Sequence, residues 1–288
     1  MTRGIDHIVH VVRDLAGMAA IYEHLGFQVG AENTHPWGTR NRLVQLPRFY
    51  VELLSISEPK KIPPHTERAR SFGAFNHEFL QQCGEGLAQL VLQATDPRAD
   101  KAVFDKAGIG GFDLFDFVRM GRRADGSKIE VAFSLAFARD PASPHAGFFT
   151  CLHKTPENIW SVDLQRHKNG ADGISAVVFT AENPTDHHIF LECFTGARDV
   201  HATSLGLRIE TPQGEILVYD PRAFKDAFGV GPPNDAGMRF AAVIFKVRDR
   251  AATRALLETG GFQPREMHNR VIVGPEGVGG TVIGFENA

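Results

Sequence analysis

The chain has 288 residues, 43% hydrophobic and 23% charged, which is ordinary for a soluble globular protein and long enough for two domains with apolar cores. A net charge of −3, without lysine- or arginine-rich blocks, argues against nucleic acid or an anionic membrane as the main partner. The chain has three scattered cysteines, and no export signal follows Met1. No apolar run approaches the roughly 18 residues that a membrane helix needs. These features favour a cytoplasmic protein.

The first segment is predicted to be a βαβββ unit. Asp14 can cap the N-terminus of its helix, and Gly26 supplies the C-terminal stop. The expected strands are Ile5–Val12, Phe27–Glu32, Thr39–Leu46 and Phe49–Ile56, and the helix is Leu15–Leu25. The proline-containing stretch 57–84 is expected to connect this unit to the next, with room for a short helix.

Three further units follow the same order. The second has strands Leu87–Gln93, Leu114–Arg119, Ile129–Phe137 and Phe148–His153, a helix Pro97–Ala107 and a hairpin turn at Asp125-Gly126. The third has a strand Ile174–Phe179, a helix Asp186–Phe194 and strands ending at Glu215–Tyr219. The fourth spans Phe240–Phe285, with Thr253–Thr259 as its helix core. Pro156–Gly173 and Pro221–Gly237 are expected to be links.

One interval between a capping residue and a glycine recurs in all four units. The step is 12 residues in three copies and 13 in the other, which indicates a duplicated unit. The copies are Asp14–Gly26, Asp96–Gly108, Asn183–Gly196 and Asp249–Gly261. The residue seven positions before each capping residue lies in the middle of a predicted strand. In chain order these residues are His7, Gln89, Ala176 and Ala242. Since an alanine methyl group cannot bind a metal or a proton, chemistry is expected in the first half, and the second half is expected to be metal-free.

Several short motifs, in their order, resemble the vicinal oxygen chelate superfamily, which includes glyoxalase I, extradiol dioxygenases and bleomycin-resistance proteins. They are Asp6-His7, Arg13-Asp14-Leu15, Tyr22, Leu25-Gly26-Phe27 and Tyr50-Val51-Glu52-Leu53. The stretch His35-Pro36-Trp37-Gly38-Thr39, followed by Asn41, is similar to the glyoxalase-like domain branch. The resemblance is strongest over residues 4–170.

The resemblance implies an α+β fold in which four βαβββ modules pair into two bowls. The expected domains are residues 1–165, holding one divalent metal in the first bowl, and residues 166–288, a degenerate partner without metal. Such a metal would be zinc, nickel, manganese or iron.

By the same resemblance, His7 and Glu52 match the ligands on the first and last strands of the first module. Strand parity agrees, because both side chains can face the bowl while His10 faces away. Gln89 matches a weaker ligand, and His153 is the expected further ligand, with Cys151 as its alternative. Two histidines and one carboxylate suit zinc, nickel or iron(II). The second glutamate that glyoxalase I uses as base is missing.

Other interpretations stay open for these residues. His7 could be a buried core histidine, and Cys151 a small buried hydrophobe. Glu52 could pair with Arg40, Arg42 or Arg119, because an unpaired buried carboxylate is costly. His35-Pro36-Trp37-Gly38-Thr39 could be only a turn. The residues expected to line the pocket are His35, Trp37, Asn41, Tyr50, Arg119 and Phe149, while the catalytic residues are not identified.

The remaining histidines suggest no chemistry, and His10 and His187 are expected on the surface or in links. His167-Lys168-Asn169-Gly170 is interpreted as a turn that pins a link, and Glu286 as structural. The predicted function is a metal-dependent lyase, isomerase or dioxygenase acting on a small molecule with vicinal oxygens. The alternative is a metal-free sequestration protein of the bleomycin-resistance type, for which Trp37, Tyr50, Phe148 and Phe149 would also serve. The expected partner is a small-molecule substrate, and a homodimer is left open.

Overall fold

The computed structural model describes residues 2–122, 127–233 and 237–288. The first module contains β1 (Ile5–Val11), α1 (Leu15–His24), β2 (Asn33–Thr34), β3 (Thr39–Leu46) and β4 (Phe49–Ile56). The second contains β5 (Gly86–Gln93), α3 (Pro97–Lys106), β6 (Phe115–Arg122), β7 (Lys128–Ala138) and β8 (Gly147–His153). The helix α2 (Phe72–Gln82) connects the two modules.

The second half repeats this pattern. The third module contains β9 (Ala171–Thr180), α4 (His188–Thr195), β10 (His201–Thr203), β11 (Gly206–Glu210) and β12 (Glu215–Tyr219). The fourth contains β13 (Arg239–Val247), α6 (Arg250–Thr259), β14 (Arg265–Met267), β15 (Arg270–Val273) and β16 (Val282–Asn287). The helix α5 (Pro221–Phe228) connects them.

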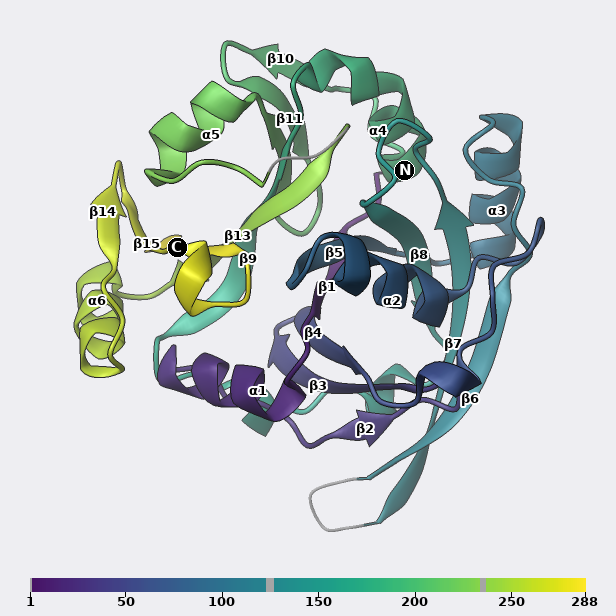
Figure 1. Ribbon diagram of the computed structural model, residues 1–288, viewed down its shortest axis with the longest axis horizontal. Coiled ribbons are helices and arrows are strands. Elements are labelled where there is room, and N and C mark those ends of the chain that lie inside the picture. The colour runs from purple at the N-terminus through teal and green to yellow at the C-terminus, as the bar shows by residue number, and fades with distance from the viewer. Residues whose placement is uncertain (1, 123–126, 234–236) are drawn as a thin grey trace.

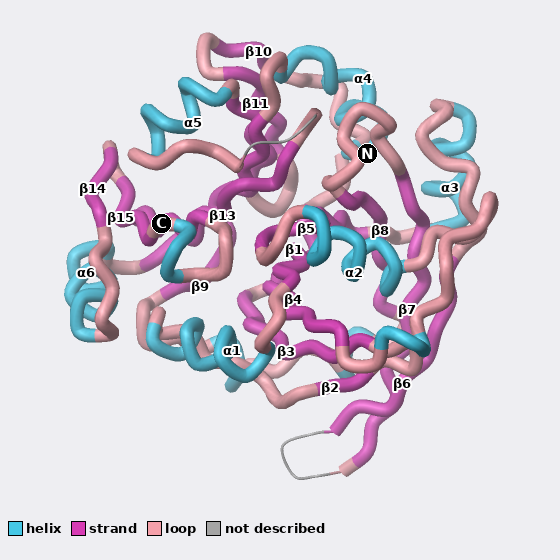
Figure 2. Tube along the Cα trace, viewed as in Figure 1, coloured by secondary structure: helices cyan, strands magenta, loops and turns pink. Residues whose placement is uncertain are grey.

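The modules pair into two curved sheets of eight strands each among the described residues (Figures 1 and 2). The strand orders are β2-β3-β4-β1-β5-β8-β7-β6 and β10-β11-β12-β9-β13-β16-β15-β14. In each sheet the first strands of the two modules, β1 with β5 and β9 with β13, pair antiparallel at the centre. The predicted α+β fold of four βαβββ modules in two bowls is confirmed. The domain boundary at residue 165 stays a prediction.

The recurring capping residues explain why the modules fold alike. The side chains of Asp14, Asp96 and Asp249 each accept hydrogen bonds from backbone N–H groups of the helix that follows. The glycines at the other ends have positive φ, 86° at Gly26 and 88° at Gly261, a conformation that other residues rarely adopt. The 12-residue interval is therefore the length of one capped helix.

The helices α2 and α5 fill the concave faces of the two sheets (Figure 1). In the first bowl Phe75 and Phe79 of α2 pack with Val9 and Val91 of the sheet. In the second bowl Phe224 and its neighbours on α5 occupy the corresponding face. Each bowl is thus partly occupied by a helix from its own chain.

The outer faces of the two sheets share one apolar core that joins the halves. Phe148 stacks on Phe179 at 5.8 Å between ring centroids, across the two halves. The link before the third module is pinned to the first, because His167 Nδ1 accepts from the N–H of Gln28 and Asn169 Nδ2 donates to the carbonyl of Leu25. The predicted pinning turn is confirmed.

Three expected elements differ from the structure. Residues 27–32 form no strand, because Phe27 turns into the core against Phe245 and Gly30 makes one hydrogen bond to Leu43 instead of a ladder. The expected link Pro221–Gly237 contains α5, which Asp220 caps and Gly229 ends. The expected link Pro156–Gly173 holds 3-10 helices at Pro156–Asn158 and Asp163–Gln165, and β9 begins before it ends. The Asp125-Gly126 turn lies outside the described residues.

Two histidines expected on the surface are buried between the halves. His10 Nε2 lies 2.9 Å from the carbonyl oxygen of Gly279, and its Nδ1 lies 3.0 Å from the hydroxyl of Tyr22. His187 Nδ1 lies 2.7 Å from Asp140 Oδ2. Both placements correct the expectation from sequence. None of the helices in the described ranges has the length and apolarity needed to cross a lipid bilayer.

Candidate functional site

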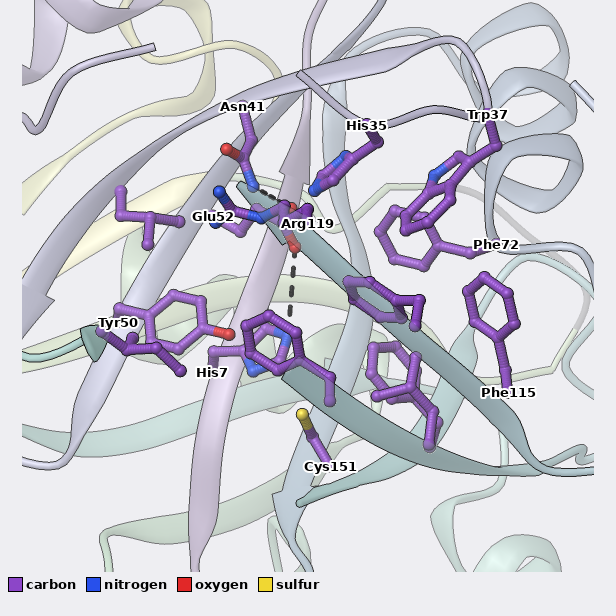
Figure 3. A pocket seen from close by; sticks show the side chains of 16 residues that line it. His7, His35, Trp37, Asn41, Tyr50, Glu52, Phe72, Phe115, Arg119 and Cys151 are labelled. Atoms are coloured by element: carbon purple, nitrogen blue, oxygen red, sulfur yellow. Dashed lines mark hydrogen bonds and ion pairs between the residues drawn. The ribbon is translucent and has the colours of Figure 1, made fainter. Parts of the chain in front are cut away.

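The concave face of the first sheet surrounds a cavity of about 50 Å³ beside α2 (Figure 3). Much of its wall is aromatic, made by Trp37, Tyr50, Phe72, Phe115, Phe117, Phe133 and Phe149. The polar side chains on the wall are His7, His35, Asn41, Glu52 and Arg119. An apolar wall with a few convergent polar groups is typical of small-molecule sites. The structure places on this wall all the residues expected to line the pocket: His35, Trp37, Asn41, Tyr50, Arg119 and Phe149.

His7 lies at the centre of the cavity floor, on β1. Its ring stacks on Tyr50 with 4.3 Å between centroids and 10° between planes, and Phe149 meets it edge-on. Its Nδ1 lies 2.6 Å from Asp6 Oδ2, and its Nε2 lies 3.9 Å from Glu52 Oε2. The ring is therefore packed against two aromatic side chains and held at one nitrogen, while the other nitrogen points toward Glu52.

Asp6 is a site residue that the sequence analysis missed. Strict alternation along β1 would turn Asp6 away from the face that His7 occupies. The pairing of β1 with β5 shifts register between Ile5 and His7, however, and this irregularity lets both side chains meet. Asp6 Oδ2 also lies 3.0 Å from His153 Nε2. An aspartate beside a histidine inside an apolar strand was the available signal.

The charge state of Asp6 fixes the donors around it. Burial would raise its pKa, but His153 and His7 outweigh burial and lower it to about 2. An ionised carboxylate only accepts hydrogen bonds, so His7 donates through Nδ1 and His153 through Nε2. This leaves the lone pair of His7 Nε2 directed toward the cavity whenever the ring is neutral.

Glu52 lies on β4, where its Oε1 accepts a hydrogen bond of 2.6 Å from Asn41 Nδ2. Burial raises its pKa, while His7, Asn41 and Arg119 act in the opposite direction. The alternative of an arginine partner finds no ion pair with Glu52 among the described residues, and Arg40 pairs with Glu32 at 3.6 Å. Glu52 Oε2 therefore remains directed at His7 rather than at a guanidinium.

His153 and Cys151 of β8 lie on the other side of His7. Together with Asp6 they bring three potential ligand atoms within 4.8 Å of one another. His153 stacks on Trp160 at 5.8 Å and donates to Asp6, so its Nε2 is not directed at Glu52. Burial raises the pKa of the Cys151 thiol well above its usual value, with Asp6 and Glu52 acting in the same direction. The choice between these two as ligands stays a prediction.

Gln89 does not line the cavity. Its Oε1 accepts a hydrogen bond of 3.0 Å from Asn76 Nδ2 on α2, and its side chain packs against Gly147. The structure thus brings His7 and Glu52 together and places Gln89 beneath α2. The sequence led us to expect a weak ligand here, but this contact with Asn76 leads us to expect that Gln89 does not bind the ion.

The chemistry of the His7–Glu52 pair fits a divalent cation. His7 Nε2 and Glu52 Oε2 face each other at 3.9 Å, and neither makes a hydrogen bond with the described residues. Imidazole and carboxylate ligands each lie about 2.0–2.2 Å from zinc, so a small shift would let both bind one ion. Asp6 holds the second nitrogen of His7, which is the usual support of a metal-binding histidine.

The second bowl offers different groups at the corresponding positions. Ala176 and Ala242 stand on its first strands and pack against α5. Glu286 at the end of β16 is held by a 2.7 Å contact with Arg270 Nε and by Ser175. The interpretation of Glu286 as structural agrees with these contacts.

The sequence matches the model of a family described as "Glyoxalase-like domain" over residues 5–192. A search of curated proteins found no match. Similar solved structures include a hypothetical protein from Staphylococcus aureus, 14% identical, with a TM-score of 0.67 over 99% of this chain and 100% of that chain. A mutant of 4-hydroxymandelate synthase from Streptomyces coelicolor is 10% identical, with a TM-score of 0.60 over 99% and 92%.

A third similar structure is a xylose isomerase-like TIM barrel/4-hydroxyphenylpyruvate dioxygenase fusion protein, 14% identical, with a TM-score of 0.52 over 92% of this chain and 40% of that chain. At such low identities these structures show a common fold. The family match spans the whole first bowl and more than half of the chain. The chain therefore belongs to the glyoxalase-like domain family.

Proposed function

We propose that this protein is a divalent-metal-dependent enzyme of the lyase, isomerase or dioxygenase type that acts on a small molecule with vicinal oxygens. The observation that carries the proposal is the pair of free atoms, His7 Nε2 and Glu52 Oε2, facing each other across 3.9 Å at the cavity floor. Family membership supports this proposal, as does the similarity of the fold to a 4-hydroxyphenylpyruvate dioxygenase fusion protein.

His7 and Glu52 would hold the ion, with Cys151 or His153 as a further ligand. A bound zinc, nickel, manganese or iron(II) ion would supply Lewis acidity, which stabilises negative charge developing on a substrate oxygen. Neighbouring residues would position the two ligands. Asp6 orients His7, Asn41 orients Glu52, and Tyr50 and Phe149 restrain the imidazole ring. The aromatic wall excludes water and packs on the apolar part of the substrate.

Elemental analysis of protein purified without a metal-affinity tag tests this proposal. We expect about one zinc, nickel, manganese or iron per chain, and a loss of most of that metal in Glu52→Gln, which keeps the shape of the side chain without its charge. His201→Ala, on the exposed strand β10, is the matched control and should retain the metal. Protein that contains no metal and cannot be loaded with any would overturn the proposal.

A metal-free sequestration protein is the second candidate. The aromatic share of the cavity wall favours it, since flat apolar ligands bind well between such rings. In that case Glu52→Gln would bind an apolar aromatic ligand as tightly as the native protein does, and neither would contain metal.

A further inference from the structure

Arg119 brings a positive charge to the cavity without a carboxylate bound to it. It lies on β6, and its Nη1 donates a hydrogen bond of 3.0 Å to Asn33 Oδ1. Its Nε is buried without a hydrogen-bond partner, and no carboxylate of the described residues forms an ion pair with this guanidinium. Burial lowers the pKa of Arg119, and the nearby Glu52 offsets this in part without forming an ion pair with it. A half-buried guanidinium without a directly bound anion is costly, because desolvation of the charge is only partly repaid.

A second unpaired donor lines the same cavity. Trp37 is 9% exposed, and its indole Nε1 is buried with no hydrogen-bond partner. The indole plane is fixed by His35, stacked at 4.7 Å, and by Phe117, edge-on at 4.8 Å. A buried N–H without an acceptor is costly, so two such donors that line one cavity point to an acceptor that the protein itself does not supply.

His35 contributes no competing charge. Its Nδ1 lies 2.8 Å from Thr39 Oγ1, and burial, with the nearby Arg119, lowers its pKa to about 3. His35 is therefore neutral near pH 7. The positive charge on this side of the cavity comes from Arg119, while the adjoining surface is made by aromatic rings such as Phe115 and Phe117.

We propose that the substrate of this cavity is a small organic carboxylate, whose oxygens accept hydrogen bonds from Arg119 and Trp37 while its apolar part packs among the phenylalanine rings. The inference rests on the proposed function, since it names the substrate class of the same site. The anion-binding groups, Arg119 and Trp37, are distinct from the proposed metal ligands His7 and Glu52. The alternative role for Arg119 is only to offset the charge of Glu52, which its electrostatic effect on the Glu52 pKa allows.

Calorimetric binding of matched ligands separates these roles. The probes are benzoate against benzamide, and the smaller pair propionate against propionamide, because each pair differs in charge but little in shape. Full-length protein is used after treatment with a chelator, so that no metal contributes. We expect each carboxylate to bind at least about tenfold more tightly than its amide, as charged hydrogen bonds require.

Two variants locate the preference. Arg119→Gln should abolish it, and Trp37→Phe, which keeps an aromatic ring but loses the N–H, should weaken carboxylate binding severalfold with little effect on the amide. Arg40→Gln is the matched control, since Arg40 pairs with Glu32 and does not line the cavity. Melting curves establish that each variant is folded. If Arg119→Gln does not fold, the test rests on Trp37→Phe, and carboxylate binding that is unchanged in this variant overturns the proposal.

The proposal is overturned if carboxylate and amide bind alike, if neither carboxylate binds, or if the preference survives in folded Arg119→Gln and Trp37→Phe. Failure of the metal proposal would give a different set of results. In that case the protein takes up no metal, yet the chelator-treated chain still prefers carboxylates through Arg119.

Discussion

Asp6 and His7 are neighbours in sequence, yet their side chains meet, with 2.6 Å between Asp6 Oδ2 and His7 Nδ1. The register shift between β1 and β5 makes this contact possible. It fixes which nitrogen of His7 carries the proton and leaves Nε2 for Glu52. Asp6, His7 and Glu52 thus form a row of adjacent polar side chains at the cavity floor. His153 contacts Asp6 at the end of this row away from Glu52.

The first prediction concerns this contact. Asp6→Asn should weaken the affinity for zinc about 10–100-fold, because the carboxylate that orients and polarises the metal-binding histidine becomes a neutral amide. Calorimetric titration of metal-stripped protein measures the change. Asp172→Asn, which alters a surface aspartate beside Arg248, is the control and should bind zinc as the native protein does. Equal affinities for Asp6→Asn and the native protein would show that Asp6 does not support a ligand.

The second prediction concerns Gln89. Gln89→Ala should leave the zinc affinity unchanged within about twofold, because Gln89 is bonded to Asn76 beneath α2 and does not reach the cavity. The same titration measures it, with Glu52→Gln as the variant in which binding should be lost. A tenfold loss in Gln89→Ala would instead identify the amide as a ligand.

The third prediction concerns pH and the contact between the halves. Burial lowers the pKa of His10 from 6.5 to about 4, although the Gly279 carbonyl and Glu85 act in the opposite direction. The unfolded chain therefore binds this proton first, and the stability present above pH 6.5 is lost as the pH falls toward 4. The loss is about 3 kcal/mol for a shift of this size.

Denaturant unfolding at a series of pH values tests the role of His10. His35 titrates in the same window, so the difference between variants isolates the part due to His10. His10→Gln should show a shallower decline of the unfolding free energy between pH 6.5 and 4, and the exposed-site control His201→Gln should decline as the native protein does. Identical slopes for all three proteins would refute this assignment.

The fourth prediction concerns the helix that occupies the first bowl. Phe79 of α2 is 1% exposed in the core of that bowl, so Phe79→Ala should lower the free energy of unfolding by about 3–5 kcal/mol. Chemical denaturation measures this loss. Ile189→Ala, at a residue that is 64% exposed, should change it by no more than about 0.5 kcal/mol. A small effect at Phe79 would mean that α2 is only loosely seated.

The modules could be predicted from the sequence because their signals are local. Aspartate at the start of a helix and glycine at its end act through hydrogen bonds and backbone conformation within a few residues. Strand parity likewise placed His7 and Glu52 on one face, as the structure shows. The same local signals were present at Asp220 and Gly229, but the prolines that follow them suggested a link rather than α5.

The rest depends on contacts between distant segments. The register shift at Asp6 arises from pairing with β5, some 85 residues away, and strand periodicity cannot show it. The displacement of Gln89 depends on Asn76 and on α2 entering the bowl. His10 is buried because the second half packs against it, and His187, which belongs to the second half, is buried against Asp140 of the first half.

Thermal unfolding of metal-stripped protein with and without zinc, nickel, manganese or iron(II) tests the central claim, that His7 and Glu52 bind a cation, most directly. A ligand that binds only the native state stabilises it, by about 2.7 kcal/mol at a hundredfold excess over its dissociation constant. We therefore expect at least one of these ions to raise the melting temperature of the native protein and of His201→Ala, and to leave His7→Ala and Glu52→Gln unchanged. Curves that no ion moves, or an equal rise in His7→Ala, would contradict the account.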